Sequence, residues 1–210
     1  MPSETKQTTA AAITKSPADN KSKTTTPDNK IDPNAPLEKF FKDALKDILW
    51  AEQAIITGLK KMQKEATNDS LKDALEDHEI ETRKHISRLE KVFESIGEKA
   101  EPKKCAAMEG ILKEADEMVA STPEGSATRD AIIIIAAQKV EHYEIATYGG
   151  LVAIAHTLQL NKAAKLLQKT LDEEENTDAL LTDIAEEEIN FSAAEEDDEE
   201  NDKKQGDKNQ

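Results

Sequence analysis

The sequence has few aromatic residues and no long apolar run. Phe, Trp and Tyr together make up 3% of the 210 residues, whereas 34% of the residues are charged. This composition, with many Ala, Leu, Lys and Glu, is typical of long helices rather than of a β-sheet. No run approaches the ~20 apolar residues that a membrane helix needs. The N-terminal region also has no apolar signal core. We therefore expect an all-α protein without a membrane span.

Cysteine and basic residues are also scarce. Cys105 is the only cysteine, which excludes an intramolecular disulfide and agrees with a reducing compartment, so we expect a cytoplasmic location. The chain has 28 basic and 44 acidic residues, giving a net charge of −16. Because this charge repels phosphate backbones, nucleic acid is not expected as a partner.

Both ends of the chain differ in composition from its middle. Residues 1–36 are rich in Thr, Ser, Lys, Asp, Asn and Pro, and residues 191–210 contain the acidic run Glu195–Glu200. Neither segment has enough large apolar side chains to form a core. The sequence therefore predicts a disordered N-terminal tail, one helical domain at residues 37–190 and a disordered acidic C-terminal tail.

Apolar spacing and capping residues predict four long helices and one short helix in this domain. The long helices span about 37–66, 70–96, 127–158 and 162–190, and the short one about 105–120. Gly97 is expected to end the second long helix and Asn161 to cap the fourth. Short links within each helix pair, and about 30 residues between the pairs, favour two antiparallel hairpins joined by a long crossover. This connectivity predicts a ferritin-like four-helix bundle.

Polar residues interrupt the apolar stripe of each long helix near its middle. They are Glu52 on the first helix, His78 and Glu81 on the second, Glu141 and Glu144 on the third, and Glu174 and Asp178 on the fourth. Because antiparallel helices of similar length bring their midpoints together, these residues are expected to meet in one layer.

A layer of this kind needs positive charge. An isolated buried carboxylate loses several kcal/mol of solvation unless it is protonated, paired or bound to a metal. Six carboxylates share the predicted layer, with no Lys or Arg on the same stripes. Two divalent cations would balance much of this charge, and an oxygen-rich site with imidazole suits iron or manganese. The pattern therefore predicts a site for two metal ions.

One segment carries a specific family resemblance. Residues 136–149, with the sequence AAQKVEHYEIATYG, closely resemble the signature helix of the YciE/YciF family, which are ferritin-like bacterial stress-response proteins. Weaker matches occur in the same order along the chain: Asp47 with Trp50–Gln53, His78-x-x-Glu81-Thr82, Cys105–Gly110, and Thr170-Leu171 followed by Glu173-Glu174 and Asp178. Together they cover about residues 37–189.

The resemblance implies a ferritin-like homodimer with a dinuclear metal site and a role in stress tolerance. Carried onto this sequence, the implied metal ligands are Glu52, His78, Glu81, Glu141, Glu144, Glu174 and Asp178. The set departs from the general ferritin pattern, because the histidine precedes its glutamate on the second helix and Asp178 replaces an expected histidine. The site therefore offers fewer nitrogen donors.

Several residues also have a structural interpretation. His78 could instead be a neutral core histidine bonded to a carboxylate, and His85, two turns further along, is interpreted as such a core residue. Tyr143 and Tyr148 are expected to pack and to hydrogen bond around the site. Cys105 is expected to attach the short helix to the bundle.

The leading functional hypothesis is a di-metal carboxylate protein whose reduced iron or manganese ions react with dioxygen or peroxide. Such a reaction would oxidise ferrous iron or remove peroxide; enzymatic activity stays open at this point, and no catalytic residue is assigned. The alternative is a metal-free dimeric bundle that binds a partner and whose buried carboxylates are protonated or paired. Metal dependence distinguishes the two.

Overall fold

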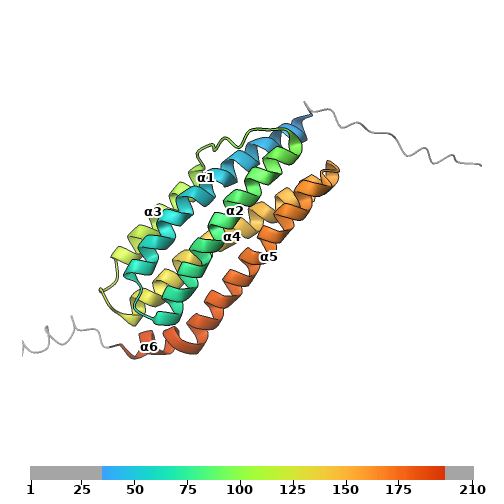
Figure 1. Cartoon of the computed structure of the whole chain (residues 1–210). Helices are drawn as coiled ribbons and strands as arrows, with labels where there is room; N and C mark the ends of the chain where they lie inside the picture. The colour runs from blue at the N-terminus through green and yellow to red at the C-terminus, as the bar shows by residue number, and fades with distance from the viewer. Residues whose placement is uncertain (1–34, 197–210) are drawn as a thin grey trace, which may run out of the picture. The chain divides into compact units, whose positions relative to one another are not determined.

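The computed structural model describes residues 35–196, and every regular element in that range is helical. The elements are α1 (Pro36–Glu65), α2 (Asp69–Ile96), α3 (Ala106–Ala120), α4 (Ala127–Thr157), α5 (Asn161–Ile184), the π-helical turn η1 (Ala185–Ile189) and α6 (Asn190–Glu195) (Figure 1). The predicted all-α class is confirmed. Most of the two predicted tails, residues 1–34 and 197–210, lies outside the described residues.

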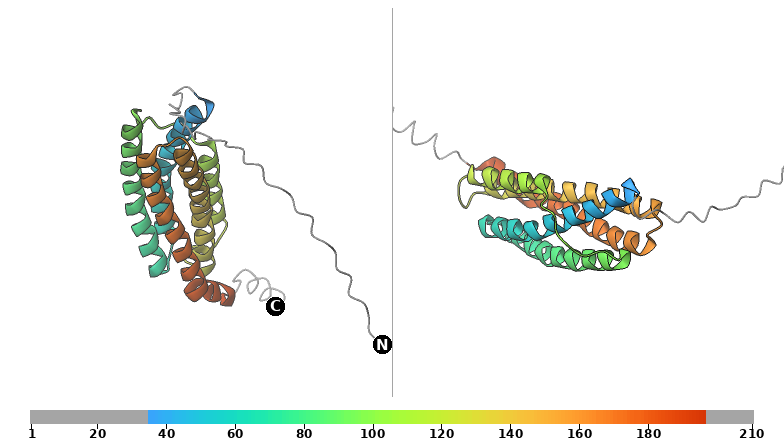
Figure 2. Two further views of the ribbon diagram at one scale, coloured as in Figure 1. Left: turned by 90° about the vertical axis from the view of Figure 1, so that its right-hand side faces the viewer. Right: turned by 90° about the horizontal axis from the view of Figure 1, so that it is seen from above.

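Four long helices form the bundle, and a long crossover joins their two hairpins. Helix α1 packs on α2, α4 packs on α5, and the hairpins meet where α1 contacts α4 and α2 contacts α5. The crossover contains α3, which runs back along the bundle against α1 and α4, so that α2 and α4 point in the same direction (Figures 1 and 2). This arrangement confirms the predicted ferritin-like topology.

Several helix ends follow the local sequence. The side chain of Asn68 accepts a hydrogen bond from the Leu71 amide at the start of α2, and Ser126 does the same for α4. Gly97 ends α2 with a φ of 72°, a conformation that a side chain disfavours. The predicted cap at Asn161 is wrong. Leu160 occupies the cap position without a side-chain bond, and its packing against the core places the first turn one residue earlier.

The last helix does not run straight to residue 190 as predicted. It widens into η1 and continues as α6 to Glu195. A π-helical turn adds a residue to the helical cycle and so redirects the side chains that follow. Here Glu188 accepts hydrogen bonds from Asn68 and Ser70, each at 3.0 Å, and thereby joins this turn to the start of α2.

A buried aspartate fixes the same end of the bundle. Asp130, near the start of α4, is 2% exposed. Its carboxylate accepts hydrogen bonds from the backbone amides of Thr67 and Asn68 at 2.8 and 2.9 Å, and from the Thr67 hydroxyl. These bonds hold the turn between α1 and α2 against the second hairpin.

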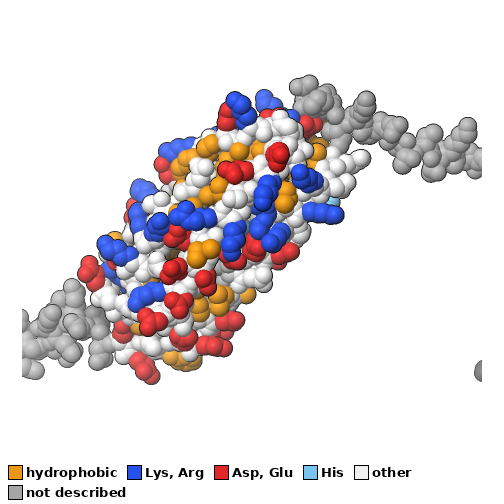
Figure 3. All heavy atoms as spheres, in the orientation of Figure 1, with side chains coloured by type: hydrophobic (Ala, Val, Ile, Leu, Met, Phe, Trp, Pro, Cys, Tyr) orange, Lys and Arg blue, Asp and Glu red, His pale blue; other side chains and the backbone are white. Residues whose placement is uncertain are grey.

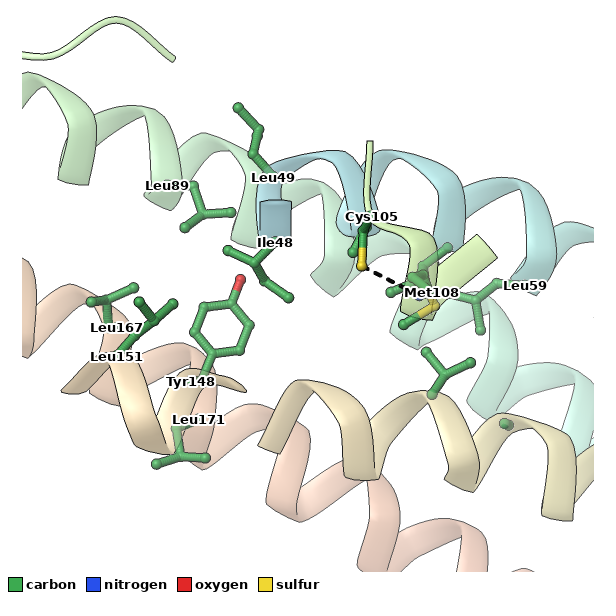
Figure 4. Close-up of a cluster of buried hydrophobic side chains, with 14 of the residues drawn as sticks. Ile48, Leu49, Leu59, Leu89, Cys105, Met108, Tyr148, Leu151, Leu167 and Leu171 are labelled. Carbon is green, nitrogen blue, oxygen red and sulfur yellow. Dashed lines mark hydrogen bonds between the residues drawn. The ribbon is translucent and has the colours of Figure 1, made fainter. Parts of the chain in front are cut away.

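Helix α3 is attached through buried sulfur-containing residues, as predicted for Cys105. The Cys105 thiol accepts a hydrogen bond from the Met108 amide and lies 3.0 Å from the Tyr143 hydroxyl, which donates to Asp47 on α1. Cys105 and Met108 are both buried (Figure 4). Burial raises the pKa of the Cys105 thiol, so this group stays protonated and acts as a structural contact.

Apolar side chains fill the bundle on both sides of its middle. Figure 4 shows Ile48, Leu89, Leu151 and Leu167 around one part of this core, with Tyr148 projecting from α4 towards α1. The face in Figure 3 interleaves acidic and basic side chains with small apolar patches. None of the helices between residues 35 and 196 is both long and apolar enough to span a bilayer.

Candidate metal centre

Six buried side chains with metal-ligating atoms meet near the middle of the bundle. They are Glu52 of α1, His78 and His85 of α2, Glu141 and Glu144 of α4, and Glu174 of α5. Each is at most 2% exposed. They form two groups, and within each group the donor atoms lie within 4.8 Å of one another.

The first group combines three carboxylates with one imidazole: His78, Glu141, Glu144 and Glu174. Glu141 and Glu144 are three residues apart on α4 and therefore share a face. The Nε2 atom of His78 lies 3.1 Å from Oε1 of Glu141 and 3.8 Å from Oε2 of Glu174. This group has the donors to surround one cation.

The second group combines Glu52, His85 and Glu174. The Nδ1 atom of His85 lies 2.9 Å from Oε1 of Glu174 and 3.7 Å from Oε2 of Glu52. Glu174 therefore turns one oxygen towards each histidine and belongs to both groups. A carboxylate in this position can bridge two metal ions.

The strongest sign of a metal centre is a set of unpaired polar atoms. Among residues 35–196, nine buried side-chain atoms have no partner with hydrogen-bond geometry, despite the close approaches given above. All nine belong to the six clustered residues: one atom each in Glu52, His78 and His85, and both carboxylate oxygens in Glu141, Glu144 and Glu174. An unpaired buried polar atom costs about 1–3 kcal/mol. Such a concentration is expected where these atoms coordinate cations.

The ring nitrogens that face away from the cluster do have partners. Nε2 of His85 lies 3.0 Å from the Glu173 carboxylate, and Nδ1 of His78 lies 3.3 Å from the Thr177 hydroxyl. Metal-binding histidines commonly donate their second N–H to such a group, which fixes the ring. The two histidines therefore direct different nitrogens into the cluster.

Without cations, protons take their place on the histidines. Burial by itself lowers the pKa of His78, but the carboxylates of Glu141 and Glu174 outweigh it and raise that pKa from 6.5 to about 9. Burial likewise opposes charge on His85, while Glu174 and Glu52 raise its pKa to about 10. The carboxylates thus favour positive charge at both rings, and a cation that binds a ring nitrogen must displace the proton there.

The pKa values of two buried carboxyl groups, Glu144 and Glu174, are also raised. Burial raises the pKa of Glu174 from 4.5 to about 7, although His85 opposes this change. Burial and the neighbouring carboxylates of Glu174, Glu52 and Glu141 raise the pKa of Glu144 well above its usual range. These shifts arise because four carboxylates share a space with few compensating charges.

Tyr148 borders the second group. It is fully buried, and its hydroxyl donates a hydrogen bond to Oε1 of Glu52. Burial, together with the Glu52 and Glu144 carboxylates, raises the pKa of Tyr148 well above 10, so the phenol keeps its proton. This contact agrees with the role expected for Tyr148 and leaves Oε2 of Glu52 to face His85.

Five of the seven sequence-predicted ligands lie in the cluster, namely Glu52, His78, Glu141, Glu144 and Glu174. Glu81 and Asp178 do not belong to either group. Glu81 is partly exposed at the edge of the buried face of α2, about 60° around the helix from His78. Asp178 points to the outer side of α4, where it lies 3.1 Å from His142 and accepts a hydrogen bond from Gln138.

His85 is the ligand-type residue that sequence reasoning assigned to the core instead. It lies seven residues after His78, which is two helical turns and only about 20° around the axis. That spacing was the available signal. His85 was not predicted as a ligand because the ligands were expected in a single narrow layer. The cluster instead extends along α2 and includes both histidines.

The donor set fits two divalent cations. Four carboxylates and two neutral imidazoles carry a charge of −4, which two such cations neutralise. Carboxylates with one imidazole per ion suit iron and manganese. The combined count of glutamates and histidines also equals that of the ferritin-like di-metal pattern, although their distribution over the helices differs.

Comparisons with known proteins identify the family of the chain. Residues 36–194 match the family described as a domain of unknown function, DUF892. Protein YciF of Escherichia coli (strain K12) is 44% identical over 158 residues, which cover 75% of this chain and 95% of that protein.

Solved structures show the same relationship. The crystal structure of the E. coli stress protein YciF matches with a TM-score of 0.70 and 43% identity, covering 74% of this chain and 98% of that one. YcfI from Rhodopseudomonas palustris matches with a TM-score of 0.68 and 40% identity, covering 70% and 92% of the two chains. This chain therefore belongs to the DUF892 family, the YciE/YciF family that its helical motifs resemble.

Proposed function

We propose that this protein binds two iron or manganese ions and that the loaded centre reacts with dioxygen or peroxide during bacterial stress. The observation that carries the proposal is the set of nine buried atoms without a partner of hydrogen-bond geometry, all on six side chains that face one another. The stress role is supported by the similarity to YciF, which is described as a stress protein.

The six side chains would form two metal positions. His78, Glu141 and Glu144 would hold one ion, Glu52 and His85 would hold the other, and Glu174, which belongs to both groups, would contribute to each. The second position has three side chains against four at the first. Since iron and manganese commonly take more than three donors, an ion held at the second position would leave room for a small oxidant.

A bound iron or manganese pair would supply electrons to the oxidant, and reduction of one hydrogen peroxide to two waters consumes two electrons and two protons. The chain itself excludes bulk water, because the six ligands are buried among packed helices. The Tyr148 hydroxyl donates a hydrogen bond to Oε1 of Glu52, so this carboxylate has only one free oxygen. Glu174, whose oxygens face both groups, would balance the charge of ions held at the two positions.

The test begins with metal content. Protein loaded anaerobically with ferrous iron or manganese and then desalted should retain about two ions per chain by elemental analysis. Glu141→Ala removes a donor from the first group and should lower this ratio. The exposed Glu175→Ala, on α5 beside Glu174, is the matched control and should retain both ions. Consumption of peroxide or dioxygen by the loaded protein then tests turnover.

The opposite results identify the alternative. Wild-type protein that retains neither iron nor manganese would reject the di-metal proposal and favour a metal-free bundle that binds a partner. Two retained ions without consumption of either oxidant would reject turnover while keeping the metal centre. A homodimer also remains a proposal, and sedimentation measurements of the full chain test it.

A further inference from the structure

A buried hydrogen-bond cluster lies directly outside the metal centre, on α2 and α5. Nη1 of Arg88 donates to the Thr170 hydroxyl and to Oε2 of Glu173, both at 2.6 Å, and Nη2 donates to Oε1 of Glu173 at 3.2 Å. Arg88 is 8% exposed. Such a two-pronged contact between guanidinium and carboxylate fixes the plane of the carboxylate.

The fixed carboxylate in turn determines the orientation of His85. Arg88 donates a hydrogen bond to each oxygen of Glu173, so both oxygens of this carboxylate act as acceptors. Glu173 can therefore only accept from Nε2–H of His85, at 3.0 Å. That bond leaves Nδ1 as the ring nitrogen that faces Glu174 and Glu52.

Thr177 acts in the corresponding place for His78. The Thr177 hydroxyl donates its single proton to the backbone carbonyl of Glu173, at 3.2 Å. Its oxygen can then only accept from Nδ1–H of His78, at 3.3 Å. This contact leaves Nε2 of His78 facing Glu141.

We infer that Glu173, clamped by Arg88, and Thr177 are separate positioning residues, each of which selects the ring nitrogen that one metal position receives. The inference rests on the proposed function and deepens it. A half-turn of the His85 ring would exchange Nδ1 with Cδ2 and Nε2 with Cε1. Carbon atoms would then face Glu173 and Glu174. The bond to Glu173 prevents this half-turn and preserves the second position.

The two positioning contacts should be separable by mutation, because they serve different ions. Zinc is a suitable probe, since it is diamagnetic and binds imidazole and carboxylate. In zinc-loaded wild-type protein labelled with ¹⁵N-histidine, NMR should show metal on Nδ1 of His85 and on Nε2 of His78. Glu173→Ala should weaken the second zinc by about 10–100-fold and leave the first unchanged. Thr177→Val should weaken the first zinc instead.

Conservative variants and the metal-free protein separate positioning from folding. Glu173→Gln keeps a carbonyl acceptor and should restore much of the second zinc affinity that Glu173→Ala loses, with circular dichroism confirming that both fold. Glu175→Ala should leave both zinc affinities unchanged. In metal-free Glu173→Ala, freedom of the ring should split or broaden the His85 ring resonances while those of His78 stay sharp.

Two results would overturn the inference. One is equal weakening of both zinc ions in Glu173→Ala and Thr177→Val. The other is an unchanged His85 ring signature in metal-free Glu173→Ala. Wild-type protein that binds no zinc, iron or manganese rejects the proposed function instead, and the ring resonances of the metal-free variants still decide whether Glu173 positions His85.

Discussion

The Tyr148 hydroxyl occupies one oxygen of Glu52, while the other oxygen of the same carboxylate faces His85. The phenol thus makes a carboxylate with two equivalent oxygens into one with two different environments. Because both groups are fully buried, water does not compete for this bond.

Tyr148→Phe should therefore separate stability from metal content. The metal-free variant is expected to lose about 2 kcal/mol of unfolding free energy, since a buried acceptor left without its partner costs about 1–3 kcal/mol. It should still retain two ions, because no donor atom is removed. Urea unfolding and elemental analysis measure the two effects. Loss of an ion from Tyr148→Phe would show that the phenol is needed to orient Glu52.

The stability of the metal-free protein should fall as pH rises. The folded-state pKa values of His78 and His85, about 9 and 10, exceed the ordinary 6.5, and that of Glu174, about 7, exceeds 4.5. The folded protein therefore binds more protons than the unfolded chain between about pH 4.5 and 10. The histidine contributions are complete below pH 6.5 and are lost as pH passes through 9 and 10. The Glu174 contribution is lost as pH rises through 7.

Urea midpoints of metal-free protein at pH 5.5, 7.5 and 9.5 test this order, and a midpoint that stays level or rises would contradict it. Protein loaded with manganese should show the opposite dependence in its metal content. Protons compete with the cation for His78, His85 and the carboxylates, so acidification should release the ions.

Glu144→Gln should stabilise the metal-free protein and weaken metal binding. Burial and three neighbouring carboxylates disfavour the ionised form of Glu144, and glutamine has the shape of the protonated form without its tendency to ionise. We expect a gain of about 2 kcal/mol at pH 8, measured by urea unfolding. The exposed Glu175→Gln should change stability by no more than about 0.5 kcal/mol. A loss of stability in Glu144→Gln would show that the charge is compensated within the protein.

Asp130→Ala should destabilise the bundle without affecting the metal centre. The substitution leaves the amides of Thr67 and Asn68 without their acceptor, and we expect a loss of about 2–3 kcal/mol. Thermal unfolding of Asp130→Ala beside the exposed Asp73→Ala measures this difference. Unchanged stability, or loss of bound metal at full stability, would contradict the assignment of Asp130 to the end of the bundle.

The helix hairpins and the crossover could be predicted because they depend on local patterns. Apolar spacing reports the 3.6-residue period directly, and the lengths of the links restrict which helices are neighbours. The π-helical turn at Ala185–Ile189 has no comparable local signal. It allows Glu188 to reach Asn68, a contact between residues far apart in the sequence.

The composition of the cluster was harder to predict than the fold. Glu52, Glu141 and Glu144 lie in the middle of their apolar stripes, and small rotations of a helix leave them inside. Glu81 lies at the edge of its stripe, where packing of α2 decides between core and solvent. Successive side chains of a helix point 100° apart, so the sequence pattern alone does not determine how α2 is rotated about its axis. Predicting that His85 belongs to the cluster required knowledge of how far the cluster extends along α2.

The contacts of Asp130 and Glu188 also have a consequence for synthesis of the chain. Their partners at the turn between α1 and α2 lie 63 and 120 residues earlier in the sequence. At about 5–20 residues per second, a ribosome needs on the order of ten seconds to add the later residues. The first hairpin therefore leaves the ribosome with an uncovered apolar face and without its contacts to Asp130 and Glu188. During that interval the nascent hairpin is the species that a chaperone would meet.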